Sequence, residues 1–103
     1  MPAILHGTSD FDQVMVKHPD GFEVILVNID GSVHGYRNVC PHIGIGLDYG
    51  DGRCKHGERE LICNMHGALF EADSGLCVDG PCSGESLMRI PVQIDQAGRV
   101  VCL

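Results

Sequence analysis

The chain has 103 residues, the size of one ordinary domain, and leaves no room for a large catalytic domain beside it. Its formal net charge of −7 argues against nucleic acid as a partner, because phosphates attract the opposite sign. Hydrophobic content is 44%, but aromatic content is only 5% and there are fourteen glycines. This composition indicates a small, loop-rich β protein with a core of Val, Ile and Leu.

The N-terminal ten residues predict neither export nor membrane attachment. They contain no basic stretch followed by an apolar one, as a signal peptide would. The longest apolar run, residues 24–27, is far too short to cross a bilayer. We therefore expect a cytoplasmic protein with no membrane partner, in which the cysteines outside the motifs described below are reduced thiols: Cys54, Cys77, Cys82 and Cys102.

Strands and turns are predicted along the chain, because no stretch has a sustained helical period. Residues 22–29 form the clearest strand, an apolar β-branched run that ends at Asp30-Gly31. This dipeptide is typical of two-residue hairpin turns. Residues 33–37 should then return antiparallel to the first strand.

The C-terminal end contains a second apolar pair, residues 87–94 and 99–103, around Gln96-Ala97-Gly98. Pro91 lies inside the first segment of this pair, and because it has no N–H to donate, it favours a sheet edge or a bulge. The middle of the chain is rich in Gly, Cys and His and has short strand candidates at residues 60–63, 68–70 and 76–78.

Two short motifs in this middle region each pair a cysteine with a histidine. Cys40-Pro41-His42 is followed, twenty residues later, by Cys63-Asn64-Met65-His66, so that two thiolates and two imidazoles are available to one metal centre. In a [2Fe-2S] centre of the Rieske kind, two cysteines hold one iron and two histidines hold the other. Gly44 and Gly67 suit the tight loops this requires, because a missing Cβ lets the backbone turn sharply and bring N–H groups close to sulfide.

The pattern C-x-H, a variable stretch and C-x-x-H-G resembles that of the Rieske family. The resemblance implies a single Rieske domain over residues 1–103, with a cluster-binding subdomain at about 38–84. It implies an all-β fold, a small antiparallel β-barrel or sandwich made by both ends of the chain, into which this subdomain is inserted. A third loop containing proline usually shields the cluster, and residues 80–84 lie where it would be. One [2Fe-2S] cluster would be held by four ligands: Cys40, His42, Cys63 and His66.

Departures from the family pattern indicate which type of Rieske protein this chain resembles. High-potential respiratory members resemble C-T-H-x-G-C and C-x-C-H-G-S-x-Y, in which the extra cysteines form a disulfide that braces the loops. This chain has Ile45 and Met65 at those places, so that disulfide cannot form. The Ser and Tyr whose hydroxyls bond to sulfur and raise the potential are replaced by Ala68 and Phe70. A potential low in the roughly −150 to +300 mV Rieske range is expected, as in ferredoxins that feed oxygenases.

The resemblance implies a one-electron carrier and not an enzyme. No G-x-S-x-G or P-loop motif is present, and a Rieske oxygenase would need a separate mononuclear iron domain. The expected partners are a NAD(P)H-dependent flavoprotein reductase, which donates the electron, and a terminal oxygenase, which accepts it. In the family the imidazoles bind through Nδ1, so Nε2 of His42 and His66 would face outward as the electron exit.

Three alternatives stay open at this point. A zinc-stabilised interaction module would also use Cys₂His₂, although zinc sites usually group the two cysteines together and the two histidines together. A second C-x-H, Cys54-Lys55-His56, could replace the first, although six residues separate it from Cys63 and its charged neighbours suit a solvated turn. The chain could also be a small subunit of a larger oxidoreductase such as nitrite reductase. Many such subunits lack the four ligands, which are all retained here.

Overall fold

The structure is a computed structural model that describes residues 3–41, 44–48, 50–64 and 67–103. Within these residues the chain is all-β, as predicted, and contains no helix, hence none that could cross a membrane. Three antiparallel sheets have the orders β1-β11-β10, β2-β3-β4-β9 and β5-β6-β7-β8. The strands are β1 (Ala3–His6), β2 (Gln13–Lys17), β3 (Glu23–Ile29), β4 (Ser32–Arg37), β5 (Lys55–His56), β6 (Glu60–Ile62), β7 (Leu69–Glu71), β8 (Cys77–Asp79), β9 (Arg89–Ile90), β10 (Val92–Ile94) and β11 (Val100–Cys102).

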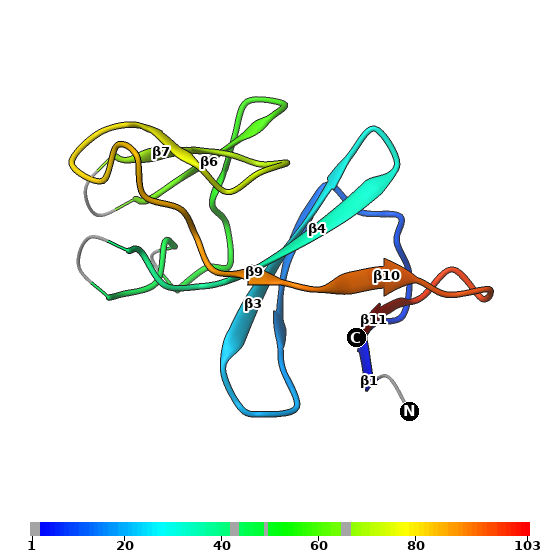
Figure 1. Cartoon of the computed structure of the whole chain (residues 1–103). Helices are drawn as coiled ribbons and strands as arrows, with labels where there is room; N and C mark the ends of the chain where they lie inside the picture. Colours follow the sequence, from blue (N-terminus) through cyan, green and yellow to red (C-terminus); the bar gives the residue numbers. More distant parts are fainter. Residues whose placement is uncertain (1–2, 42–43, 49, 65–66) are drawn as a thin grey trace.

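The first two sheets form a base domain from both ends of the chain, residues 3–37 and 89–103. β1 pairs with β11, so the N- and C-terminal ends lie near each other, while β6 and β7 lie apart from them at the upper left of Figure 1. The sheet β5-β6-β7-β8 and the loops around it form the inserted part, which we call the cluster-binding subdomain. The predicted barrel or sandwich with an inserted subdomain is therefore confirmed.

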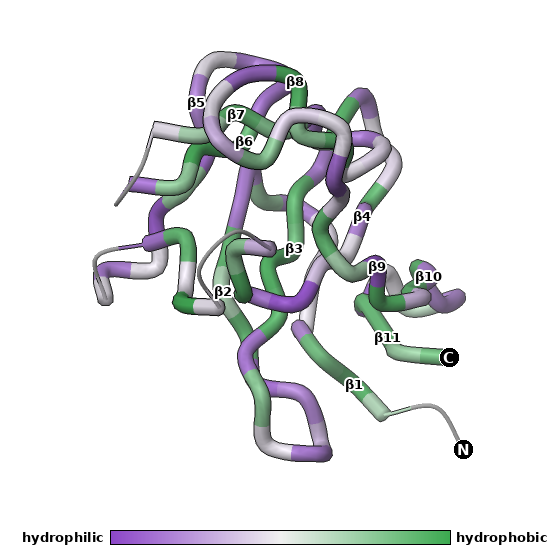
Figure 2. Tube along the Cα trace, turned by 60° about the vertical axis from the view of Figure 1, so that its left-hand side comes forward, coloured by the Kyte–Doolittle hydropathy of each residue, from purple (hydrophilic) through white to green (hydrophobic). Residues whose placement is uncertain are grey.

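β3 owes its continuous apolar sequence to burial on both faces. Because side chains alternate along a strand, Val24 and Leu26 face one core and Ile25 and Val27 face another. The first core belongs to the base domain, and the second is shared with the cluster-binding subdomain. The hydrophobic colour of β3 at the centre of the molecule is visible in Figure 2. Half-buried strands would alternate apolar with polar residues, so the unbroken run identifies β3 as the central layer.

The hairpin predicted after β3 is present. Asp30 and Gly31 have φ angles of 54° and 89°, as a two-residue hairpin turn with positive φ at both positions requires. β4 then returns antiparallel to β3 in a continuous register from Val24↔Arg37 to Ile29↔Ser32. This turn therefore fixes the pairing of the two longest strands of the base domain.

The C-terminal pair differs from the single strand predicted over residues 87–94. That segment is divided at Pro91 into β9, which pairs with β4, and β10, which pairs with β11. The two short strands lie at the edges of different sheets. The expectation of an edge position is confirmed, and the proline marks the point where the chain passes from one sheet to the other, since it cannot continue a hydrogen-bonded ladder.

The cluster-binding subdomain contains the three short strands predicted for it, each within a residue of the expected bounds. The solvated turn expected around Cys54-Lys55-His56 is found directly after it, at residues 57–59, which are exposed. Lys55 and His56 form β5, which pairs with β6 in a hairpin, and Cys54 is buried. The motif itself is therefore part of the hairpin, and the charged residues after it form the solvated turn. The subdomain is fastened to the base by the buried hydroxyl of Tyr36, which donates to the carbonyl of Ala72 at 2.9 Å.

Candidate metal centre

The first motif lies on a tight turn that begins at Cys40. The N–H of Cys40 donates to the carbonyl of Ile45 at 2.6 Å, and the N–H of Gly44 donates to the carbonyl of Cys40 at 2.8 Å. Gly44 has a φ of 73°, in the left-handed region where other residues are strained. Both hydrogen bonds that close this turn therefore involve the backbone of Cys40.

The second motif repeats this geometry at the same relative positions. The N–H of Cys63 donates to the carbonyl of Ala68 at 2.8 Å, and the N–H of Gly67 donates to the carbonyl of Cys63 at 2.7 Å. Gly67 has a φ of 70°. The two segments are thus closed by the same pair of backbone hydrogen bonds. The requirement for glycine at both positions, which we predicted from the sequence, is confirmed.

The thiols of the two turns lie in the same buried environment. Cys40 and Cys63 have no exposed surface and belong to one apolar cluster, together with Leu47, Ala68 and Phe70. The two predicted histidine ligands, His42 and His66, lie outside the described residues. Cys40 and Cys63 therefore share one buried core, and their role as cluster ligands stays a prediction.

Asn38 holds the chain that leaves the first turn. Its side-chain oxygen accepts the N–H of Leu47 at 2.8 Å, and its amide donates to Asp48 at 2.9 Å. The Asp48 carboxylate also accepts the N–H groups of Gly50 and Gly52, at 3.0 and 2.8 Å. Burial alone would raise the pKa of Asp48, but these hydrogen bonds, Asn38 foremost, hold it below its ordinary value. A charged carboxylate thus organises the loop after the first motif.

Asn64 connects the second turn to the same loop. Its backbone N–H and its side-chain amide both donate to the carbonyl of Leu47, at 2.8 and 3.1 Å. The amide also donates to the carbonyl of Arg53 at 3.0 Å. Neither Asn38 nor Asn64 was expected to have this role, although asparagine beside glycine-rich segments is typical of side-chain to backbone bonding. These two residues tie the two turns together.

Residues 80–84 lie against the second turn, where a third loop was expected. A Cβ added to Gly80 would be 2.8 Å from Cα of Ala68, so the two backbones are in close contact. Cys82, next to Pro81, is buried, and burial followed by the contact with Cys77 raises the pKa of its thiol to about 12. The proline-containing segment therefore covers one side of the second turn.

The second C-x-H does not have the geometry of the two motifs. The carbonyl of Cys54 accepts the N–H of Ile62 at 2.7 Å, a bond to β6 and not one that closes a turn. Burial, followed by the charges of Asp48 and Asp51, raises the pKa of the Cys54 thiol to about 12. His56, two residues later, is exposed. Within the part of the chain that the structure describes, no group of three or more His, Cys, Asp or Glu side chains is arranged to hold a metal ion.

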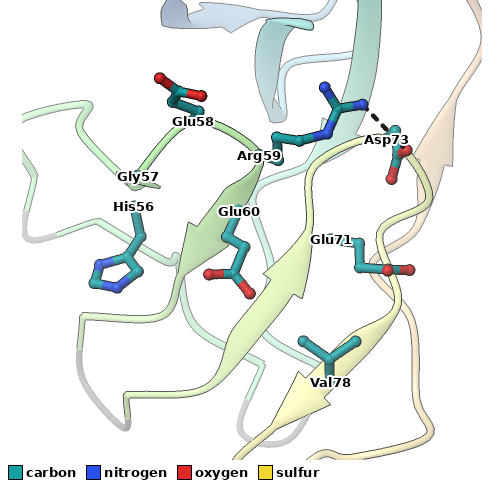
Figure 3. A pocket seen from close by; sticks show the side chains of 8 residues that line it. All are labelled: His56, Gly57, Glu58, Arg59, Glu60, Glu71, Asp73 and Val78. Carbon is teal, nitrogen blue, oxygen red and sulfur yellow. Dashed lines mark ion pairs between the residues drawn. The ribbon is translucent and has the colours of Figure 1, made fainter.

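An acidic hollow of about 630 Å³ lies on the outer face of β6 and β7. Glu60 and Glu71 are paired across these strands, and Figure 3 shows Arg59 pointing toward Asp73, with a closest separation of 3.9 Å. Together with Glu58, four of the described lining residues are acidic and one is arginine, which leaves the hollow negative. A separate, more apolar groove beside the first turn is lined by Arg37, Val39, Pro41, Gly44, Ser86 and Met88.

The match to a known protein family covers most of the chain. Residues 6–102 match the Rieske [2Fe-2S] domain. This is nearly the whole chain, and the chain therefore belongs to the Rieske [2Fe-2S] family. Its cofactor is one [2Fe-2S] cluster, which the buried thiols of Cys40 and Cys63 suit, because cluster iron is held by thiolates shielded from water.

Similar solved structures include two ferredoxins and one oxygenase. The Sphingomonas yanoikuyae B1 ferredoxin is 23% identical, with a TM-score of 0.78 over 99% of this chain and 97% of that one. The ferredoxin of carbazole 1,9a-dioxygenase from Nocardioides aromaticivorans IC177 is 25% identical, with a TM-score of 0.77 over 99% and 96%. The terminal oxygenase of carbazole 1,9a-dioxygenase from Novosphingobium sp. KA1 is 25% identical, with a TM-score of 0.78 over 100% of this chain but 29% of that one. No curated protein sequence matches the chain.

Proposed function

We propose that this chain is a Rieske-type ferredoxin, a one-electron carrier between a reductase and a terminal oxygenase. The observation that carries the proposal is the pair of matching turns, which place two buried cysteines at equivalent positions. One iron would be held by the cysteines and the other by the histidines. The ligand set is the one predicted from the sequence: Cys40, His42, Cys63 and His66.

The cluster, when bound, supplies one reversibly held electron. The protein's own contribution is a rigid and largely dry surrounding. Leu47, Ala68 and Phe70 have no exposed surface and exclude water from the thiols. Asn38 and Asn64 hold the loops through hydrogen bonds with backbone groups, so the site changes little when the electron arrives. A fixed site of this kind suits electron transfer without any bond being made or broken.

The terminal oxygenase is the proposed acceptor, since one similar ferredoxin belongs to a carbazole dioxygenase. A ferredoxin-type carrier is favoured, because the chain matches both ferredoxins over nearly their full length. The apolar groove beside Pro41, with the 60% exposed Met88 at its edge, is the proposed docking surface next to the cluster. The proposed donor is a NAD(P)H-dependent flavoprotein reductase, and the proposed compartment is the cytoplasm.

Metal analysis and EPR test the ligand assignment. The purified protein should contain two irons and two acid-labile sulfides. Its reduced form should have an average g below that of all-cysteine clusters, since nitrogen ligands donate less charge than thiolates. Replacing His42→Cys or His66→Cys should lower the midpoint potential, and His56→Cys is the matched control that should not. Stoichiometric zinc without iron after gentle purification would refute the proposal.

Reconstitution tests the carrier role separately. With a NAD(P)H-dependent flavoprotein reductase and a ring-hydroxylating oxygenase, product should form only when the intact protein is present. The Cys63→Ser variant should give none. Co-purification with a fixed large subunit, and no activity as a separate component, would favour the alternative of an oxidoreductase subunit.

A further inference from the structure

Cys77 and Cys82 form a thiol pair that the carrier function does not use. Their Sγ atoms are 2.7 Å apart, and each side chain is 2% exposed. Sγ of Cys77 also lies 3.3 Å from the carbonyl oxygen of Asp79, to which its thiol can donate. A covalent S–S bond is about 2.0 Å long, so only a small movement separates this contact from a disulfide.

Backbone hydrogen bonds hold the two cysteines in this position. The N–H of Cys77 donates to the carbonyl of Glu85 at 2.8 Å, and its carbonyl accepts the N–H of Gly84 at 3.2 Å. The N–H of Glu85 donates in turn to the carbonyl of Cys82 at 2.9 Å. Residues 77–85 are thus a closed loop whose backbone bonds involve both cysteines. The contact between the sulfurs follows from the loop and does not depend on side-chain rotamers alone.

The pair is buried, but residues next to both cysteines in the sequence are exposed to solvent. The neighbours of Cys82 on both sides, Pro81 and Ser83, are exposed, and so is Val78 beside Cys77. Opening the loop by a few residues would therefore uncover the sulfurs. Cys54 and Cys102 have no such partner, since they belong to different buried cores.

We propose that Cys77 and Cys82 are a thiol–disulfide site that fastens the third loop to β8. Hydrogen peroxide is the oxidant. Two S–H bonds and the O–O bond break, one S–S bond forms, and the two electrons lost by sulfur reduce the peroxide to two waters. The new bond braces the loop that lies against Ala68. The four cluster ligands take no part.

Peptide mapping of the cluster-loaded protein tests the linkage. Asp73 and Asp79 flank Cys77, so cleavage before aspartate separates the pair into peptides 73–78 and 79–94, each with one cysteine. After limited peroxide and alkylation, these two peptides should be joined and should separate on reduction, while the visible absorption of the cluster is retained. Two alkylated, unlinked peptides would overturn the proposal. So would a linkage that includes Cys40 or Cys63.

The rate of cluster release tests whether the disulfide stabilises the third loop. Under an iron chelator, oxidised wild type should bleach several-fold more slowly than the dithiol form. That difference should vanish in Cys82→Ser and in Cys82→Ala, and persist in the control Cys102→Ser. Equal bleaching of the two wild-type forms would overturn the bracing role. Because both forms are compared in one folded protein, the result does not depend on the stability of any variant or on which oxygenase is the partner.

Discussion

The base domain and the cluster-binding subdomain of this chain are built in different ways. In the base, β3 pairs with β2 over five residues and with β4 over six, and its apolar side chains are buried on both faces. In the subdomain, β5 to β8 have two or three residues each. Its loops are held by backbone hydrogen bonds that close the turns and by bonds from side chains to backbone groups, such as those of Asn38 and Asn64.

The difference shows how one small domain can be stable at one end and specialised at the other. Hydrophobic burial along long strands is sufficient for the base, since each buried Val, Leu or Ile contributes about 1.5–3 kcal/mol. Short strands bury too little surface to hold loops in one conformation, so the subdomain depends on hydrogen bonds and, we infer, on the cluster. Tyr36, which extends from β4 to Ala72, is where the first region supports the second.

The largest expected effect is loss of the cluster, which should destabilise the cluster-binding subdomain and leave the base domain folded. Cys40→Ser and Cys63→Ser should abolish cluster binding, and the amides of β6 and β7 should then exchange rapidly while those of β3 remain protected. The measurement combines visible absorption with hydrogen exchange read by mass spectrometry. Cys102→Ser, a buried cysteine of the base domain, is the control that should keep the cluster. Equal loss of protection in β3 would show that the two regions do not unfold independently.

The same contrast explains what the sequence could predict. β3 and its hairpin were predictable, because a buried apolar run and an Asp-Gly turn are local signals. β1 and β2 were not, since β2 is a half-buried edge strand whose side chains show no alternation. The division at Pro91 was predicted only as an edge, because the assignment of β9 and β10 to different sheets depends on distant partners.

Within the site, the sequence indicated the residue types but not their supports. Cys40, Cys63 and the two turn glycines followed from motif spacing, because each turn is local. The roles of Asn38 and Asn64 could not follow, since each bonds to a segment nine or more residues away. The contact between Cys77 and Cys82 depends likewise on a loop closed by backbone bonds that the sequence does not display.

Two asparagines, one beside the cluster site and one in the base domain, test whether the two regions are stabilised separately. Asn38→Ala leaves the buried N–H of Leu47 without its acceptor, which should cost about 1–3 kcal/mol and hasten cluster loss. Asn28→Ala removes comparable bonds, to Ser9 and Gly31, in the base domain. It should lower the free energy of unfolding without changing the rate of cluster loss at neutral pH. Urea unfolding and chelator bleaching measure the two effects, and faster bleaching in both variants would contradict the division.

Smaller changes are expected from hydroxyls added beside the cluster. Ala68→Ser and Phe70→Tyr should each raise the midpoint potential, because each offers a donor to sulfur that becomes more electron-rich on reduction. A hydrogen bond to a charged group is worth about 1.5–3 kcal/mol, and roughly 59 mV corresponds to 1.4 kcal/mol for one electron, so shifts of tens of millivolts or more should follow. Protein-film voltammetry measures them. Ala72→Ser, in the same buried cluster of side chains, is the control expected to leave the potential unchanged.

The smallest expected effect concerns the docking of partner proteins. It compares two surfaces near the cluster, the acidic hollow and the apolar groove beside Pro41. If the acidic hollow around Glu60 and Glu71 steers docking, electron transfer from the reductase should slow several-fold as salt rises. The midpoint potential should move much less, because exposed charges are screened beyond about 8 Å at physiological salt.

Stopped-flow rates of the double variant Glu60→Gln with Glu71→Gln should show a weaker salt dependence, whereas Asp20→Asn, an exposed acid of the base domain, should behave as wild type. If instead the rate stays flat or rises with salt, docking is apolar. Met88→Ser, at the edge of the groove beside Pro41, should then slow transfer more than either acidic change does, because burial of the exposed thioether would be the main attraction.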